Sequence, residues 1–216
     1  MRTVKRRPRN RHANVLQRRV TKFVGDLLEQ PGEPTVIGLD ASLTKYGACI
    51  LGVESKAHAT MVFKPKYKGV QRLFEIYEFV QTLTLTAEHH GEVQHIVMED
   101  YAPGSHGTQK HAIGEGGGIS KFALVHLFGV EDEVAYPTLI RPNSLKKFVT
   151  GAGNAEKDTI MLRVFQKWGV ELAENNQADA YALARVALAI HSGETEYGYE
   201  ADTIRSLERS TEWPKP

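Results

Sequence analysis

The chain has 216 residues, of which 41% are hydrophobic and 25% charged, and a net charge of +1. This length suits one domain with a sizeable core, and the composition is that of an ordinary globular protein. No apolar stretch has transmembrane length and the N-terminus lacks a signal-peptide core, so we expect a cytoplasmic protein without a membrane partner. A lone cysteine, Cys49, excludes an internal disulfide.

Basic residues are concentrated at the N-terminus. Residues 1–33 hold nine Lys or Arg against three acids, whereas the remainder holds 18 basic and 23 acidic residues. Such an arm commonly contacts phosphate, with Arg6 and Arg7 as candidates, and a solvated tail or an expression-related segment is the alternative. Apolar residues at helical spacing within 13–29 predict a short amphipathic helix in the arm.

After a Pro31–Pro34 break, the pattern predicts a mixed α/β sheet, with meander-like first strands and later strands that alternate with helices. In chain order, we expect strands at about 35–40, 46–53 and 58–63, a helix at 70–89, a strand ending at Glu99, a buried helix at 121–128, a strand at 133–140, a short helix capped by Asn143 or Ser144, a helix at 155–168 and a last helix from Gln177. Residues 193–216 are polar and are expected to form an appendage.

Three acidic residues lie at the ends of these elements. Asp40 ends the first strand, Glu99 ends the fourth, and Asp179 opens the alanine-rich last helix. Each alone is more often a turn former or a helix cap, but three acids that converge form a site for hard cations. Two divalent ions held by such acids activate water and neutralise a phosphodiester, with Asp40 as the bridging ligand.

Two other chemistries are disfavoured. The nine histidines are scattered, and none pairs with Cys or acids at zinc spacing. The glycine run at 114–118 lacks the Gly-Lys-Ser/Thr ending of a P-loop. Its glycines more plausibly permit the close approach of a backbone, from a helix or from DNA.

Several segments resemble the RuvC-type Holliday-junction resolvases. Arg141–Lys157 resembles that family's Pro…Val-Lys-Lys…Val-Thr-Gly…Gly…Ala…Lys segment and is the most specific match. Ile37–Gly47 resembles its Gly-Ile-Asp-Pro-Gly…Thr-Gly-Tyr-Gly, and Met98-Glu99 its Ile-Glu. Gly114–Ile119 resembles its Leu-Gly-Gln-Ala-Arg-Gly, and Gln177–Ala184 its Ala-Asp-Ala-Leu-Ala. The matches run in order from about 35 to 191.

The resemblance implies a ribonuclease H-like fold over residues 34–192, with a mixed five-stranded sheet flanked by helices. It also implies a homodimeric endonuclease that uses Mg²⁺ or Mn²⁺, two ions per active site, and resolves four-way junctions by paired nicks. Lys157 would assist at the scissile phosphate, and Lys146 and Lys147 would contact backbone phosphate. Ordinary helix-surface lysines are the alternative.

Two positions in the active-site region depart from the family pattern. Ala41-Ser42 replaces Pro-Gly after the first acid, and Asn176 stands where the family has a fourth acid. Asn can coordinate a metal through its carbonyl oxygen but adds no charge. Asp100 and Asp158 are candidate substitutes for the missing acid.

The expected stacking aromatic, three residues beyond the strand Glu, is Ala102, which makes its neighbour Tyr101 the candidate for stacking on junction bases. The basic arm is additional to the bacterial pattern. Together these departures favour a phage or plasmid version. Two alternatives stay open: a broader nuclease of the same fold that cuts flaps, forks or RNA–DNA hybrids, and a catalytically weak DNA-binding or structural relative.

Overall fold

The structure, a computed structural model, describes residue 20 and residues 32–100 and 109–210, except the side chains at 109–113, 157–158 and 208–210. Its centre is a five-stranded sheet in the order β3-β2-β1-β4-β5. The strands are β1 (Thr35–Asp40), β2 (Tyr46–Gly52), β3 (His58–Phe63), β4 (Val93–Glu99) and β5 (Thr138–Ile140). The first three strands pair antiparallel, whereas β4 runs parallel to both β1 and β5. The predicted mixed five-stranded sheet is therefore confirmed.

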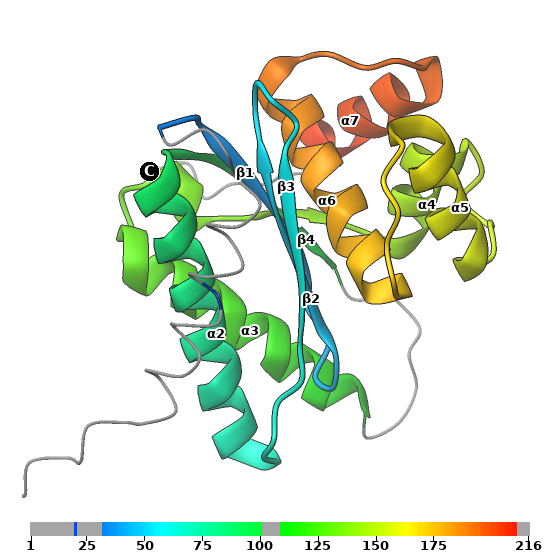
Figure 1. The fold of residues 1–216 in the computed structure, drawn as a ribbon. Coiled ribbons are helices and arrows are strands. Elements are labelled where there is room, and N and C mark those ends of the chain that lie inside the picture. Colours follow the sequence, from blue (N-terminus) through cyan, green and yellow to red (C-terminus); the bar gives the residue numbers. More distant parts are fainter. Residues whose placement is uncertain (1–19, 21–31, 101–108, 211–216) are drawn as a thin grey trace, which may run out of the picture.

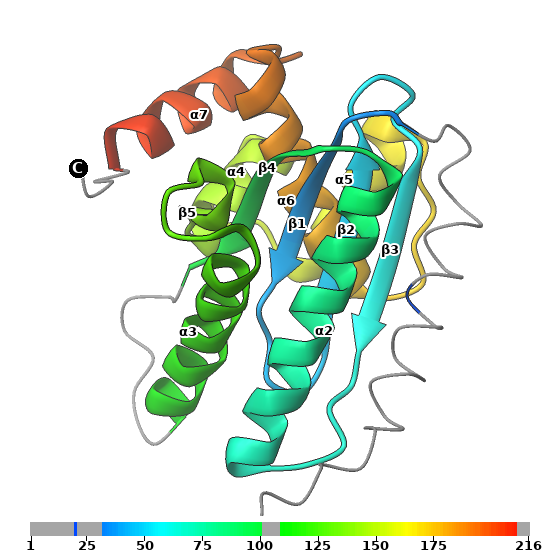
Figure 2. The same ribbon diagram turned by 90° about the vertical axis from the view of Figure 1, so that its left-hand side faces the viewer.

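Helices cover both faces of the sheet (Figures 1 and 2). One face carries α2 (Gly69–His90) and α3 (Gln109–Phe128). The other carries α6 (Asn175–Ser192), with α4 (Pro142–Thr150), α5 (Lys157–Trp168) and α7 (Gly198–Ser210) beyond it. None of the helices in the described ranges is long and apolar enough to cross a membrane.

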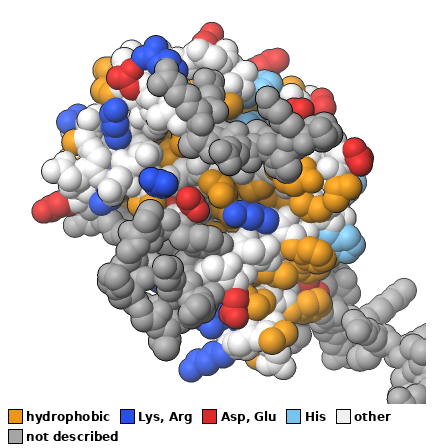
Figure 3. Space-filling model, turned by 180° about the vertical axis from the view of Figure 1, so that it is seen from behind, with side chains coloured by type: hydrophobic (Ala, Val, Ile, Leu, Met, Phe, Trp, Pro, Cys, Tyr) orange, Lys and Arg blue, Asp and Glu red, His pale blue; other side chains and the backbone are white. Residues whose placement is uncertain are grey.

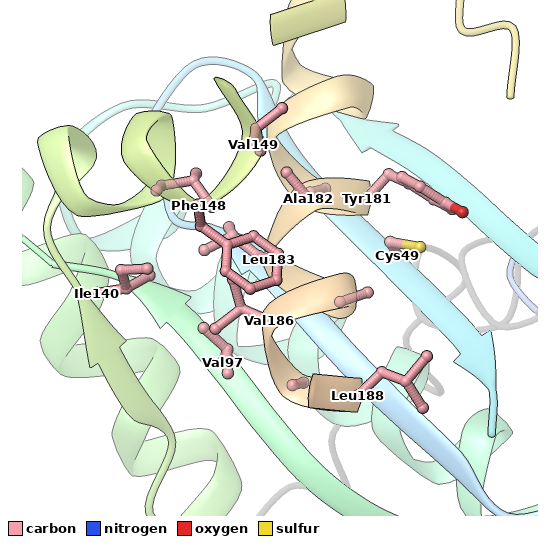
Figure 4. Close-up of a cluster of buried hydrophobic side chains, with 14 of the residues drawn as sticks. Cys49, Val97, Ile140, Phe148, Val149, Tyr181, Ala182, Leu183, Val186 and Leu188 are labelled. Carbon is pink, nitrogen blue, oxygen red and sulfur yellow. The ribbon is translucent and has the colours of Figure 1, made fainter. Parts of the chain in front are cut away.

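Helix α6 lies directly on β1 because the residues that face each other, Gly38 on the strand and Ala180 and Ala184 on the helix, are small. A Cβ added at Gly38 would lie 2.2 Å from the Ala180 carbonyl oxygen and 2.3 Å from the Ala184 nitrogen, so only glycine permits this approach. Larger side chains fill the space to either side, and Figure 4 shows Leu183 and Val186 of α6 among side chains of β4, β5 and α4. The contact fixes the start of α6 near the end of β1.

The opposite face is filled by bulky side chains. Phe79 of α2 stacks on Phe63 at a centroid distance of 4.6 Å and meets Tyr46 edge-on at 5.6 Å. The buried Tyr46 hydroxyl donates to Ser120 Oγ on α3 at 2.9 Å, which ties that helix to the sheet. Val20, the only described residue of the predicted arm helix, is helical and buried in this cluster.

Several predicted boundaries are wrong for local reasons. The predicted strand at 133–140 begins instead as a short 3₁₀ helix, η1 (Glu133–Ala135), because the Asp132 side chain accepts from the Val134 nitrogen at 3.0 Å. Neither Asn143 nor Ser144 caps α4, which begins at Pro142 after Arg141, since proline fits the first helical position. Helix α3 begins at Gln109 and runs through the glycine run, well before the predicted 121.

Part of the predicted C-terminal appendage is packed against the domain. Ile204 and Leu207 of α7 belong to the core cluster around α6. Glu200 is 3% exposed and forms an ion pair with Lys167 of α5, a contact that fixes α7 to the neighbouring helices.

Candidate active site

Asp40 and Glu99 lie at matching positions on two neighbouring strands. β1 and β4 are parallel and Leu39 pairs with Met98, so the next residue of each strand is the acid. Gly38 and Val97 both face α6, and side chains alternate along a strand, so the two carboxylates lie on the α6 face as well. The predicted convergence of these two acids at one edge of the sheet is therefore seen in the fold.

Helix α6 brings the other predicted residues to the same edge. Asn176 lies in the first turn of α6 and its side chain contacts Asp40 directly. Asp179 lies three residues further on, hence on the same side of the helix, and next to Ala180, which packs on Gly38. Asp40 is only 6% exposed, whereas Glu99 and Asp179 are half-buried.

The turn after β1 holds Asp40 in place. Asn176 Nδ2 donates to Asp40 Oδ2 at 2.9 Å and to the Lys45 carbonyl oxygen at 3.0 Å. The Lys45 ammonium pairs with Glu174 at 3.0 Å, which adds a second link between the turn and the start of α6. A Cβ at Gly47 would lie 2.3 Å from the backbone carbonyl oxygen of Asn176, so this strand position also requires glycine. Sequence reasoning missed Lys45 and Glu174 because 129 residues separate them.

The donor set fits a hard cation. Carboxylate and amide oxygens are the ligands that Mg²⁺ and Mn²⁺ prefer, and Asp40, Glu99, Asp179 and Asn176 supply only such oxygens. In the described part of the chain, no three His, Cys, Asp or Glu side chains are arranged closely enough to hold an ion. The acids are therefore neighbours at one edge without forming a closed ligand shell.

The remaining predicted residues are placed only in part. Lys146 and Lys147 are half-buried on α4, which packs against α5 and α6. Lys157 begins α5, but its side chain lies outside the described residues, as does that of Asp158. Tyr101, Arg6 and Arg7 lie entirely outside them, so their predicted roles stay predictions.

Asp100 is a poor replacement for the missing fourth acid. Its backbone nitrogen donates to the Ile140 carbonyl at 2.8 Å, which extends the β4–β5 pairing by one residue. Alternation along the strand then directs its side chain away from the face that carries Glu99. Asn176, which the resemblance places at the position of the fourth acid, is the residue whose side chain contacts Asp40.

Comparisons with known proteins agree with this geometry at the level of fold. Neither a protein-family model nor a curated protein matches the sequence. The structure is similar to Thermus thermophilus RuvC, with 20% identity and a TM-score of 0.56 over 74% of this chain and 96% of that one. It is also similar to T. thermophilus RuvC in complex with a Holliday junction substrate, with 18% identity and a TM-score of 0.59 over 74% and 94% of the two chains.

A third solved structure, the yeast mitochondrial Holliday junction resolvase Ydc2, matches with 14% identity and a TM-score of 0.46, over 91% of this chain and 88% of that one. At these identities a likeness establishes the fold alone. The chain has the ribonuclease H-like fold of RuvC, which confirms the predicted fold class.

Proposed function

We propose that this protein is a metal-dependent endonuclease that cuts branched DNA, and four-way junctions in particular. One observation carries the proposal: in a RuvC-like fold, Asp40, Glu99 and Asp179 come from three separate elements to one edge of the sheet. Such a grouping of carboxylates has no role in the core, and it provides the oxygen ligands that phosphodiester hydrolysis requires.

Each residue of the site has a distinct task in this proposal. Asp40, Glu99 and Asp179 would hold Mg²⁺ or Mn²⁺, and two such ions would lower the pKa of the attacking water and neutralise the phosphate. Asn176 orients the Asp40 carboxylate through the bond from its Nδ2. Lys157, at the start of α5, is proposed to stabilise charge on the leaving oxygen.

The DNA contacts are proposed from charge. Lys146 and Lys147 of α4 would meet backbone phosphate beside the acids, and the contact between α4 and α6 supports this. Arg6 and Arg7 of the basic arm would add salt-sensitive affinity, and Tyr101 would stack on an unpaired base. These contacts suit a branched substrate because a branch point exposes phosphate and unstacked bases together.

We also propose a homodimer, since two identical sites related by a two-fold axis match two opposed strands of a junction. An exposed aromatic cluster supports it. This cluster, the α2–α3 patch, consists of Phe74, Tyr77, Phe122 and His126. Phe74 is 49% and Phe122 58% exposed, and Figure 3 shows hydrophobic side chains gathered on this side of the molecule. Burial against a second copy would remove this apolar surface from water.

The proposal is tested with a labelled four-way junction, a replication fork, a 5′ flap, an RNA–DNA hybrid and a linear duplex, each in Mg²⁺ or Mn²⁺. We expect paired symmetric nicks in the junction, abolished in Asp40→Asn and retained in Asp202→Asn, an exposed acid on α7. Preference for the flap or hybrid would instead identify a broader nuclease. Tight junction binding without cutting in either metal would identify a DNA-binding relative.

A further inference from the structure

The Asn176 side chain serves two acceptors at once. Its Nδ2 is 2.9 Å from Asp40 Oδ2 and 3.0 Å from the Lys45 carbonyl oxygen. A carbonyl oxygen only accepts, so the nitrogen of the amide must face this pair and its two N–H groups are both used. The remaining amide oxygen is the only atom of this side chain that can coordinate a cation.

The surroundings prevent this contact from loosening. A Cβ at Gly47 would lie 2.3 Å from the backbone carbonyl oxygen of Asn176 and 3.2 Å from Asp40 Cβ, so Gly47 packs closely against both residues. The Lys45–Glu174 ion pair fixes the same turn to the same end of α6. Asp40 is 6% exposed, and a carboxylate with so little contact with water depends on a donor within the protein.

An aspartate at position 176 would reverse this interaction. Both carboxylate oxygens of an aspartate are acceptors, so neither could donate to Asp40 Oδ2 or to the Lys45 carbonyl oxygen. Two carboxylates about 3 Å apart also cannot both stay ionised without a cation between them. With asparagine, the partly positive N–H group of the amide stabilises the Asp40 carboxylate, as the positive charge of a metal ion would otherwise do. The site then carries three negative ligands instead of four.

We propose that Asn176 is a positioning residue that holds Asp40 in its working orientation in the absence of a cation, and that, because its amide adds no negative charge, the site binds divalent ions more weakly than it would with an aspartate at this position. This inference rests on the proposed function, because it concerns the cation which that function needs. The site is then ordered before it meets DNA and metal, and it binds and releases its ions readily.

The test compares wild type with Asn176→Asp, Asn176→Ala and the exchange Asp40→Asn/Asn176→Asp, by thermal unfolding in EDTA and by Mn²⁺ titration followed by EPR. Asn175→Asp is the matched control, because it adds the same charge at the neighbouring position of the same helix. In EDTA, Asn176→Asp should unfold about 4–8 °C below wild type, and Asn175→Asp should unfold close to it. The exchange variant should recover at least half of the loss, since it restores an amide–carboxylate pair.

Mn²⁺ should bind Asn176→Asp about tenfold or more tightly than wild type and should raise its unfolding temperature further. Asn176→Ala should lose stability in EDTA without this gain in affinity. Equal unfolding temperatures of Asn176→Asp and Asn175→Asp in EDTA would overturn the proposal, as would unchanged Mn²⁺ affinity. Because none of these measurements uses DNA, a wild type that fails to cut junctions would count against the proposed function alone.

Discussion

The two ends of α6 carry polar clusters of opposite character. At its start, Asp40 accepts from the Asn176 amide, and Glu99 and Asp179 lie half-buried near it. Toward its other end lies the α7 anchor, in which the Lys167 ammonium pairs with Glu200, with side chains 6% and 4% exposed. Among the described residues, the rings of Phe148, Trp168, Tyr197 and Tyr199 lie close to that ammonium.

The anchor is also saturated in hydrogen bonds. Glu200 Oε2 accepts from the backbone nitrogens of Glu196 at 2.8 Å and Tyr197 at 3.1 Å, while Oε1 meets the lysine. A buried ion pair whose carboxylate also accepts backbone hydrogen bonds holds the structure together. The acids at the start of α6 are instead proposed to bind cations, which would separate a functional cluster from a structural one.

The largest effect is expected from breaking the anchor. Lys167→Met leaves Glu200 buried without its cation, which should lower the free energy of unfolding by about 3–5 kcal/mol. Urea denaturation measures this change, and Arg205→Met, which breaks the exposed pair with Asp202, should have little effect. If both variants lost equal stability, the anchor would not differ from a surface pair.

At the other end, Asp40→Asn should lower the rate of junction cleavage at least about a hundredfold, because it removes the proposed bridging ligand. Stability in metal-free buffer should change much less than it does in Lys167→Met. Single-turnover cleavage and urea denaturation of the same samples separate the two effects. Unimpaired cleavage by Asp40→Asn would show that the acids at this edge of the sheet do not take part in catalysis.

The stability of the fold should also decrease in acid because of His95, which lies near His191 in the last turn of α6. Burial, with His191 nearby, lowers the pKa of His95 to about 4, and the ring bonds Thr138 Oγ1 at 2.9 Å. A histidine with a lowered folded pKa adds stability above its unfolded pKa of about 6.5, and this is lost as the pH falls toward 4. Between these pH values, the free energy of unfolding of the wild type should fall by on the order of 1–3 kcal/mol because of this histidine. His95→Gln should lack this fall, as measured by denaturation at stepped pH. A decline equally steep in the variant would assign it to other groups.

The smallest effect concerns the α2–α3 patch, which belongs to neither end of α6. Phe122→Ser should weaken self-association about tenfold or more, as measured by sedimentation velocity. Phe165→Ser is the matched control, because Phe165 is 53% exposed on α5, away from the patch. A monomeric wild type, or an equal loss in both variants, would exclude this patch as the contact between copies.

The sheet, and the meeting of Asp40 and Glu99 at its edge, could be predicted from the sequence because both depend on local patterns. Asp40 and Glu99 each end a buried apolar run, and parallel neighbours bring such ends together. The partners of Asn176 were not predictable, since 136 residues separate it from Asp40 and no periodicity connects them. The helix through Gly116 and Gly117 was missed because their propensity favours a loop, whereas burial against the domain overrides that preference.

The contact between Gly38 and α6 has a consequence for how the site tolerates change. Backbone touches backbone there, so the distance from Asp40 to Asn176 and Asp179 is set without any side chain that substitution could shorten or lengthen. Acids and amides can therefore be exchanged at the start of α6 while the frame that aligns them persists. A single added methyl group at Gly38 would instead displace the whole helix and separate the acids, so the proposed activity would be lost through a position that bears no functional group.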